Sequence, residues 1–537
     1  MGENCGGQSE VEAFLADPAT HGGAAVERHG THIAMVFVAG DRAYKVKRAV
    51  HYPYLDFSTL ALRRAACEHE LELNRRATPE LYIGVVPLIR TADGGLAWGE
   101  AASDAERAVE WVLVMHAFAQ EGLLDRVAAR GELDETLVAM LAEAVIAQHR
   151  GAEVVRPPAA HRGGADGLAM TVDENRQDFE ARPDIFPPER HAVLERETAA
   201  AIEANRPLLE RRLAEGKVRL CHGDLHLRNI CLIDGRPRLF DALEFNDAIA
   251  SNDCLYDLAF LLMDLDHRGL HDQANLLFNR YVLETGEAAA LGAMPLFLSV
   301  RSAIRAKVAS TTEPTRDDER RKARDREEAR RYFEEALAYL RPPPAALIAV
   351  GGLSGSGKSR LARALAPQLG PAPGALLLRS DVLRKRAFGA AETEALPAEA
   401  YTAEARRRIY DEMHGRAAAA LAAGHAVLLD AVHDRPDLRG KAAALARSSG
   451  VPLVGLWLDA SPATLLGRVA VRAGDASDAD AAVVRQQLEY DLGTIDWLRL
   501  DATQPLSEVV AEARAALATA CPGSLRTLRS DRSLKPG

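Results

Sequence analysis

The sequence lacks the features that would place it in a membrane, outside the cell or on nucleic acid. Its 537 residues contain no uninterrupted apolar run of membrane-helix length. Its first residues, MGENCGGQSE, have neither the basic region nor the apolar core of a signal peptide. The six cysteines include no Cys-x-x-Cys pair, which predicts reduced, structural thiols. A net charge of −11 argues against a dedicated nucleic-acid binder. We therefore expect a cytoplasmic protein.

The length and composition predict a globular chain of several domains. A chain of 537 residues is too long for one hydrophobic core and indicates two to four domains. Hydrophobic residues make up 48% of the sequence and charges of both signs are interspersed. These values are typical of a folded protein rather than a disordered one.

What the sequence does contain is, first, a polar pattern in residues 221–245, CHGDLHLRNICLIDGRPRLFDALEF. Asp224 precedes Asn229 by five positions, and Asp241 follows two short apolar runs joined at an Asp-Gly turn. A hairpin of this kind would bring Asn229 and Asp241 side by side. The spacing matches a phosphotransferase loop, in which one carboxylate orients a hydroxyl and an amide oxygen and a second carboxylate hold Mg²⁺. The alternative is a surface loop with ordinary turn residues.

The motifs CHGDLHLRN and LFDALEF resemble the aminoglycoside phosphotransferase and choline kinase branch of the protein-kinase-like fold. The whole chain except its two ends resembles bacterial two-domain predicted kinases that join such a domain to a P-loop kinase. The resemblance implies an α+β bilobal kinase-like domain followed by an α/β P-loop domain with a parallel sheet. It implies a reaction class and no particular substrate.

Upstream of this stretch, residues 33–39 and 43–47 predict a β-hairpin that turns at Gly40-Asp41. Lys45 resembles the kinase lysine that contacts the α- and β-phosphates. Lys47 lies on the same strand face and is an alternative, and both lysines could instead be solvated on an edge strand.

A predicted helix over residues 59–76 carries Glu68, Glu70 and Glu72. One of them is expected to pair with the lysine, and we favour Glu70, although a glutamate on an acidic helix is often only solvated. The Gly-rich phosphate loop of protein kinases is missing. Residues 109–115 predict the hinge strand, with an ordinary core strand as the alternative, and residues 122–215 predict helices. Asp257 is expected to brace the catalytic loop.

A change in composition marks the domain boundary. Residues 316–340 are densely charged with apolar residues at helical spacing, which predicts an amphipathic linker helix, and Pro342 to Pro344 end it. We therefore predict a kinase-like domain over 1–315, a linker over 316–344, a P-loop domain over 345–520 and a disordered tail over 521–537.

The second chemical pattern is a complete Walker A motif after an apolar strand. It comprises Gly352, Gly355, Gly357, Lys358 and Ser359. Its glycines let backbone N–H groups approach phosphates, and the following helix N-terminus favours anions. Lys358 is expected to reach the β- and γ-phosphates and Ser359 to bind Mg²⁺.

Polar residues follow the later strands of this domain. Asp381, with Arg384 one turn on, is a candidate general base at the carboxyl edge of the sheet, or alternatively a helix N-cap. Asp430 is a candidate Mg²⁺ carboxylate. The segment with Arg468 and Arg472 resembles the lid helix of gluconate kinase, zeta-toxin-like kinases and polynucleotide kinase, with 474–478 as the lid tip. Surface arginines are the alternative.

Together these patterns predict a tandem kinase with two ATP·Mg²⁺ sites that act on hydroxyl groups of small metabolites such as sugars, amino alcohols, aminoglycosides or nucleosides. Neither a membrane nor a nucleic acid is expected as a partner. Two alternatives stay open. One domain could be a nucleotide sensor, for which the missing Gly-rich loop points to the first domain, or the P-loop half could be an RNA-end or toxin-like kinase.

Overall fold

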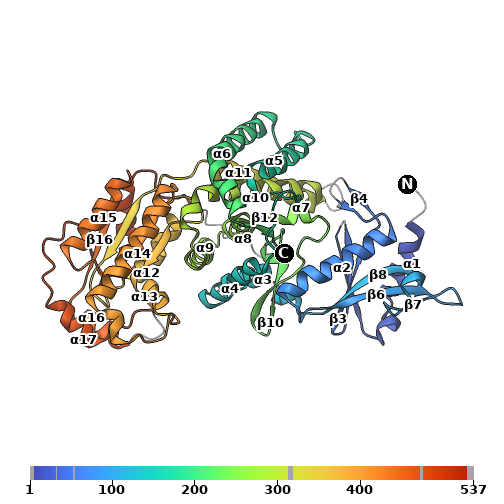
Figure 1. Ribbon diagram of the computed structural model, residues 1–537, viewed down its shortest axis with the longest axis horizontal. Coiled ribbons are helices and arrows are strands. Elements are labelled where there is room, and N and C mark those ends of the chain that lie inside the picture. Colours follow the sequence, from blue (N-terminus) through green and yellow to red (C-terminus); the bar gives the residue numbers. More distant parts are fainter. Residues whose placement is uncertain (1–4, 32, 53–54, 313–318, 472–475, 529–537) are drawn as a thin grey trace. The chain divides into compact units, whose positions relative to one another are not determined.

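The computed structural model describes residues 5–31, 33–52, 55–312, 319–471 and 476–528. These residues form two compact units. The first comprises the described residues up to Asp173 together with Leu209–Asp264, and the second comprises Glu174–Leu208 and the described residues from Leu265 onward (Figure 1).

The first unit contains a six-stranded antiparallel sheet in the order β1-β2-β3-β8-β6-β7. The expected hairpin is confirmed, because β2 and β3 pair from Ala34 opposite Lys47 to Ala39 opposite Arg42 across the Gly40-Asp41 turn. The strands are β1 (Val26–Gly30), β2 (Ala34–Ala39), β3 (Arg42–Lys47), β6 (Tyr82–Arg90), β7 (Leu96–Trp98) and β8 (Ala108–His116).

One long helix, α2 (Leu60–Ala77), covers this sheet. Thr59 caps its N-terminus by accepting a hydrogen bond from the Leu62 N–H, which satisfies one of the free amides of the first turn. Cys67 of the helix packs against Leu113 and Met115 of β8 in one apolar cluster. This packing fixes the face of α2 that carries Glu70 toward the interior of the unit.

The polar stretch of the first unit lies on short strands after the long helices. Strand β9 (Val218–Leu220) pairs with β12 (Ser251–Asp253), and β10 (Ile230–Ile233) pairs with β11 (Arg236–Leu239). The predicted helices of residues 122–215 are present with a break near 151–164. They and the helices that follow are α3 (Leu124–Ala129), α4 (Glu135–Gly151), α5 (Gly164–Glu180), α6 (Pro188–Ala214), α7 (Asp247–Ala250), α8 (Cys254–His267), α9 (His271–Thr285), α10 (Met294–Thr312) and α11 (Glu319–Tyr339).

The charged linker does form a helix, and its apolar stripe is buried. Ala329, Phe333 and Ala336 of α11 are at most 2% exposed. Serines of α10 bond to α11, since the Ser299 hydroxyl donates to the Ala336 carbonyl at 2.8 Å. By length and composition the stretch Glu287–Thr311 could cross a membrane, but 78% of its apolar 18-residue window is buried inside the fold, which is typical of a core helix.

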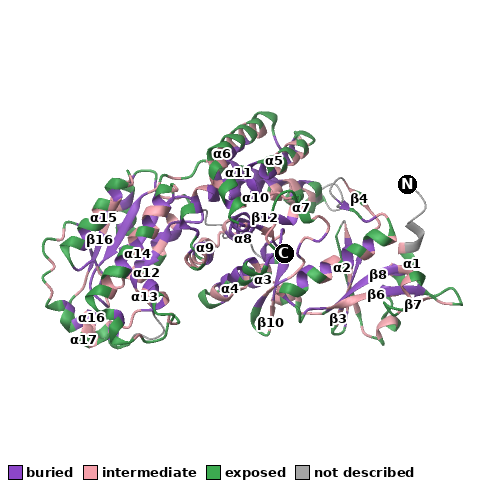
Figure 2. Ribbon diagram, viewed as in Figure 1, coloured by how far each residue is buried: buried purple, intermediate pink, exposed green. Residues whose placement is uncertain are grey.

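The second unit also contains a five-stranded parallel sheet in the order β14-β15-β13-β16-β17. Strands β13 and β15 in its centre are entirely buried, so they read as continuous apolar runs, and β16 beside them is partly buried. Figure 2 shows the purple of buried residues along this sheet. The strands are β13 (Leu347–Gly351), β14 (Leu376–Arg379), β15 (Val427–Asp430), β16 (Leu453–Asp459) and β17 (Leu498–Asp501). The helices around them are α12 (Lys358–Leu365), α13 (Ser380–Ala387), α14 (Ala403–Ala422), α15 (Pro436–Ser448), α16 (Pro462–Ala470), α17 (Ala481–Leu488) and α18 (Leu506–Ala520).

The expected disorder from residue 521 is wrong for the part of the tail that is described. Leu525 forms a bridge with Leu369, and the Arg526 guanidinium donates to the Asp266 carboxylate at 2.9 Å. Burial tends to raise the pKa of Asp266, but the Arg526 guanidinium and the hydrogen bond and charge of His271 override it and hold that pKa well below its usual range. A specific ion pair, invisible in the composition, therefore orders the segment up to residue 528. Residues 529–537 lie outside the described part.

Candidate active sites

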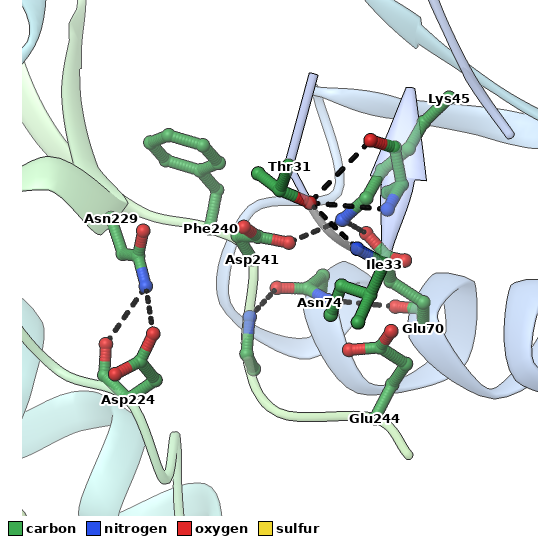
Figure 3. A network of polar contacts seen from close by, with 12 residues as sticks. Thr31, Ile33, Lys45, Glu70, Asn74, Asp224, Asn229, Phe240, Asp241 and Glu244 are labelled. Carbon is green, nitrogen blue, oxygen red and sulfur yellow. Dashed lines mark hydrogen bonds and ion pairs between the residues drawn. The ribbon is translucent and has the colours of Figure 1, made fainter. Parts of the chain in front are cut away.

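The catalytic loop of the first unit is held by hydrogen bonds within itself. The Asn229 amide donates to both the carbonyl and the carboxylate of Asp224, each at 2.9 Å (Figure 3). The His226 ring lies 3.4 Å from the same carboxylate. The spacing of five residues therefore places the side chains of Asp224 and Asn229 in contact. Only the amide nitrogen of Asn229 takes part in these two hydrogen bonds, and its side-chain oxygen does not.

Residues outside the loop fix its backbone. Asp257, fully buried on α8, accepts a hydrogen bond from the Gly223 N–H at 2.9 Å. Asp264 accepts one from the Leu227 N–H at 3.0 Å. The expected bracing contact of Asp257 is thus present, and Asp264 is a second brace that the sequence analysis did not identify.

The β10–β11 hairpin brings Asp241 to the loop. The Phe240 N–H donates to the Asn229 carbonyl at 3.0 Å, so Asn229 and Asp241 both lie at the open end of this strand pair, away from its turn. Asp241 has a left-handed backbone (φ 60°), which aspartate tolerates better than most residues, and its N–H donates to the Tyr82 hydroxyl at 3.0 Å. An amide oxygen and a carboxylate are the hard ligands that Mg²⁺ prefers, so these two residues fit the metal that the pattern implies.

Two lysines and three carboxylates form a buried network beside Asp241. Lys45 donates to Glu70 at 2.7 Å and also contacts Asp241. Lys47 donates to the other oxygen of Glu70 at 2.5 Å and contacts Glu244. Figure 3 shows Lys45, Glu70 and Asp241 converging on one side of Phe240. The expected Lys45–Glu70 pair is present, while Glu68 and Glu72 pair with arginines on the exposed face of α2.

Burial and the neighbouring charges have opposite effects on the pKa values of the groups in this network. Burial alone would lower the pKa of Lys45, but Asp241 and Glu70 raise the pKa well above its usual value. Burial tends to raise the pKa of Asp241, and Lys45 overrides it to keep that pKa below its ordinary range. Both groups are therefore charged at neutral pH. Burial raises the pKa of Glu244.

The Walker A loop of the second unit is shaped by its backbone. Gly352, Gly355 and Gly357 have φ of 134°, 85° and 95°, which side chains rarely adopt. A Cβ atom at Gly355 would lie 2.7 Å from the Leu465 carbonyl oxygen. Lys358 donates to the Leu353 carbonyl at 3.0 Å, across the loop. The Ser359 hydroxyl donates to Asp430 at 2.6 Å, so the two predicted metal ligands are in contact and fit a magnesium site.

Asp381 lies at the carboxyl edge of β14 as expected. It is not the N-cap of the next helix, because Arg379 occupies that position without a side-chain cap bond. Asp381 accepts a hydrogen bond from Arg384 at 2.8 Å, and the Arg384 guanidinium lies 5.1 Å from the centre of the Tyr401 ring. A carboxylate, a cation and an aromatic ring therefore gather at this edge.

The arginine helix differs from the expectation. Helix α16 ends at Ala470, so Arg468 and Arg472 do not share it, and Arg472 lies outside the described residues. Arg468 donates to the Ala502 carbonyl at 2.7 Å and to the Ser356 carbonyl at 3.4 Å, which ties the phosphate loop to the end of β17. Of the expected lid tip, Asp478 contacts Lys385 at 2.5 Å and the Tyr401 hydroxyl.

Several residues of these centres escaped the sequence analysis. Glu244 was not identified, and Lys47 was only an alternative to Lys45, although the alternation of Lys45 and Lys47 on one strand face could have indicated a paired role. Arg379, Tyr401 and Lys385 carried no motif. Arg379 lies 3.3 Å from the Asp430 carboxylate and is buried. A side chain whose partner lies far away in the sequence leaves no pattern in the residues around it.

Two family models of known proteins match this chain, one in each half. Residues 347–490 match the family model described as AAA domain, and residues 55–292 match the phosphotransferase enzyme family. An uncharacterized protein of Mycobacterium tuberculosis (strain ATCC 25618 / H37Rv) is 29% identical over 492 residues, covering 90% of this chain and 93% of its own. A protein from Mycobacterium bovis has the same identity and coverage.

Solved structures of kinases resemble each half separately. A gluconokinase from Sinorhizobium meliloti 1021 covers 33% of this chain and 94% of its own at 26% identity and a TM-score of 0.25. A choline/ethanolamine kinase family protein from Mesorhizobium loti covers 62% and 99% at 19% identity and a TM-score of 0.36. The family matches support a kinase with two kinase-type domains, and they establish no acceptor.

Proposed function

We propose that this kinase-type enzyme is an ATP-dependent tandem phosphotransferase, with two separate ATP·Mg²⁺ sites that each act on hydroxyl groups of small metabolites. The observation that carries the proposal is the pairing of functional groups in both units. Asp224 contacts Asn229 in the first, and Ser359 contacts Asp430 in the second. The acceptor class, a sugar, amino alcohol, aminoglycoside or nucleoside, rests on the reaction type alone.

In the first centre, Asn229 and Asp241 would hold Mg²⁺ and Lys45 would contact the α- and β-phosphates. A bound Mg²⁺ neutralises phosphate charge as it develops. Asp224 accepts the proton of the acceptor hydroxyl, and the Asn229 amide keeps its carboxylate oriented. Glu70 holds Lys45 in place from α2. Catalysis here consists of positioning and charge stabilisation.

In the second centre, Lys358 and the loop amides would bind the phosphates while Ser359 and Asp430 hold the metal. Asp381 accepts the acceptor proton, and Arg384 keeps that carboxylate in place at 2.8 Å. Arg468 lies beside the phosphate loop through the Ser356 carbonyl, from which it could neutralise phosphoryl charge. Arg472 would be the second arginine that neutralises phosphoryl charge.

The test is a phosphate-transfer screen over hydroxylated metabolites with the full chain and with two variants, Asp224→Asn and Lys358→Ala. We expect each variant to lose one set of products and keep the other. If Asp224→Asn loses no product, the first unit acts as a nucleotide sensor and catalysis belongs to the P-loop domain.

A 5′-hydroxyl oligonucleotide in the same screen tests the RNA-end alternative. Label transferred to it by the wild type and lost in Lys358→Ala would replace the small-metabolite assignment of the second centre. The proposal expects no label there, because the net charge of −11 opposes a nucleic-acid partner. A cytoplasmic location without a membrane partner is part of the same proposal.

A further inference from the structure

Helix α9 is hydrogen-bonded to the outer edge of the parallel sheet in the second unit. Strand β14 is the last strand of that sheet, with β15 as its neighbour among the described strands. An edge strand leaves every second backbone N–H and C=O without a strand partner. At this edge the outward groups are those of Ala375 and Leu377, because the Leu376 N–H between them donates inward to the Ala426 carbonyl at 2.9 Å. The outward groups therefore need a partner from another part of the unit.

Two asparagines of α9 supply that partner. The Leu377 N–H donates to the Asn279 side-chain oxygen at 2.6 Å, and the Asn279 amide donates to the Ala375 carbonyl at 3.2 Å. Asn275, which is 4% exposed, donates to the same carbonyl at 3.1 Å. A side-chain amide carries a donor and an acceptor, as a peptide group does, so Asn279 takes the place of a neighbouring strand. The helix backbone could not do so, because its N–H and C=O groups are paired within the helix.

The fit between α9 and this edge is close. Gly374 has a φ of 117°, and a Cβ atom there would lie 2.8 Å from the Asn275 amide nitrogen. Asn279 also donates to the Asn275 side-chain oxygen at 3.0 Å, so the two asparagines hold each other in orientation. Near the end of α9, Glu284 pairs with Arg386 of α13. Helix α9 is therefore attached both to β14 and to the helix that follows it.

Asp381 and Arg384 lie between these two attachment points. Leu377 precedes Asp381 by four residues, and Arg386 follows it by five. We propose that α9 belongs to the second centre and that Asn279 is a positioning residue, which holds β14 and thereby sets the position of Asp381. The inference rests on the proposed role of Asp381 as the group that accepts the acceptor proton. Asn279 acts on that carboxylate through the backbone of β14.

This role would make one centre out of segments that match two different families. Helix α9 falls within residues 55–292, which match the phosphotransferase enzyme family, whereas β14 falls within residues 347–490, which match the other family model. The P-loop domain predicted over 345–520 is therefore incomplete at this edge without α9. The tests accordingly use the full chain.

The first test compares Asn279→Ala with Asn205→Ala by hydrogen exchange. Asn205 on α6 is the matched control in the same unit, because its amide donates to the Ala201 carbonyl of its own helix at 2.9 Å. Asn279→Ala should raise the exchange rate of peptides from residues 375–387 about tenfold, since the Leu377 amide loses its acceptor. Peptides from residues 347–359 should keep the wild-type rate, and Asn205→Ala should change neither set.

The second test separates positioning from general stability. Asn279→Ala should lower kcat of the transfer that depends on Lys358 about tenfold, because the base is misplaced. The Kd for ATP, measured by calorimetry in the Asp241→Asn background, should stay unchanged, since the Walker A loop follows β13, which β15 separates from β14. Asn279→Asp keeps the oxygen that accepts the Leu377 N–H, so its exchange rate and kcat should lie between those of the wild type and Asn279→Ala.

Three results would overturn the positioning role. One is wild-type exchange of residues 375–387 in Asn279→Ala, another is faster exchange throughout the second unit, and the third is an unchanged kcat despite faster exchange at this edge. If Asn279→Ala does not fold, the same comparisons are decided with Asn279→Asp. If no product depends on Lys358, the proposed function of the second centre fails, whereas the exchange comparison still decides whether α9 holds the strand before Asp381.

Discussion

The two proposed phosphate-binding centres of this chain are assembled in different ways. In the first, Lys45, Lys47 and Glu70 come from one strand and one helix, and they meet Asp241 and Glu244 from residues nearly two hundred positions away. In the second, a continuous loop from Gly352 to Ser359 presents backbone amides, and one distant carboxylate, Asp430, completes it. The first centre depends on buried charge pairs and the second on backbone conformation. Each should therefore fail through a different kind of substitution.

The largest effect should follow from removing the carboxylate that both lysines share. Glu70→Gln leaves Lys45 and Lys47 each with one anionic partner fewer in a fully buried position, so we expect the free energy of unfolding of the first unit to fall by about 4 kcal/mol. Hydrogen exchange of peptides from each unit, followed by mass spectrometry in increasing urea, measures this loss separately in the two units.

The matched control is Glu68→Gln on the same helix. Glu68 is exposed and pairs with Arg64 at the surface, so its loss should cost less than about 0.5 kcal/mol. If both substitutions lower the free energy of unfolding equally, loss of any carboxylate from α2 destabilises the unit. The buried network around Glu70 would then not be the cause.

Acid should act on the second unit through His425. Burial lowers the pKa of this histidine to about 4, while the Gly374 carbonyl accepts its hydrogen bond at 2.9 Å. The folded-state pKa is below the unfolded value of 6.5, so its stabilisation is complete above pH 6.5 and is lost as the pH falls through 4. The difference corresponds to about 3 kcal/mol.

His425→Gln keeps a donor for the Gly374 carbonyl and removes the titration. We expect the unfolding free energy of the second unit to fall less steeply between pH 6.5 and 4 in this variant than in the wild type. Parallel slopes in wild type and His425→Gln would assign the acid sensitivity of this unit to other groups.

A substitution at Gly355 tests whether the second centre depends on the backbone conformation of its loop. A Cβ there would lie 2.7 Å from the Leu465 carbonyl oxygen, and the φ of 85° disfavours any side chain. Gly355→Ala should weaken ATP binding at this centre about 30-fold, or about 2 kcal/mol. Calorimetry in an Asp241→Asn background, in which the first centre has lost a proposed metal ligand, measures it. Gly467→Ala on α16, where the added Cβ meets nothing within 4 Å, is the control and should bind ATP as the wild type does.

The contrast between the centres also explains what could be predicted from the sequence. The Walker A loop is local, so its glycines, Lys358 and Ser359 were all identified, as were the parallel strands around it. The first centre is assembled over long distances. Asp224, Asn229 and Asp241 were recognised by spacing along one hairpin, but Glu244 has no spacing relation to Lys47 and was missed. The end of α16 at Ala470 was missed because the next residues, Val471 to Ala473, fit a helical pattern and the first helix-breaking residue, Gly474, comes after them.

The smallest effect should come from the side-chain pair that Ser359 and Asp430 form in the second centre. The Ser359 hydroxyl donates to Asp430 at 2.6 Å, and the proposed function gives both residues to Mg²⁺. Ser359→Ala should therefore raise the Mg²⁺ concentration that half-saturates ATP binding about tenfold, or about 1.4 kcal/mol, and leave ATP binding without Mg²⁺ unchanged. Ser356→Ala is the matched control, because the buried Ser356 hydroxyl makes no hydrogen bond within the described residues. If ATP binding without Mg²⁺ falls as far as binding with it, Ser359 acts on the loop rather than on the metal. The second centre would then depend on its backbone alone.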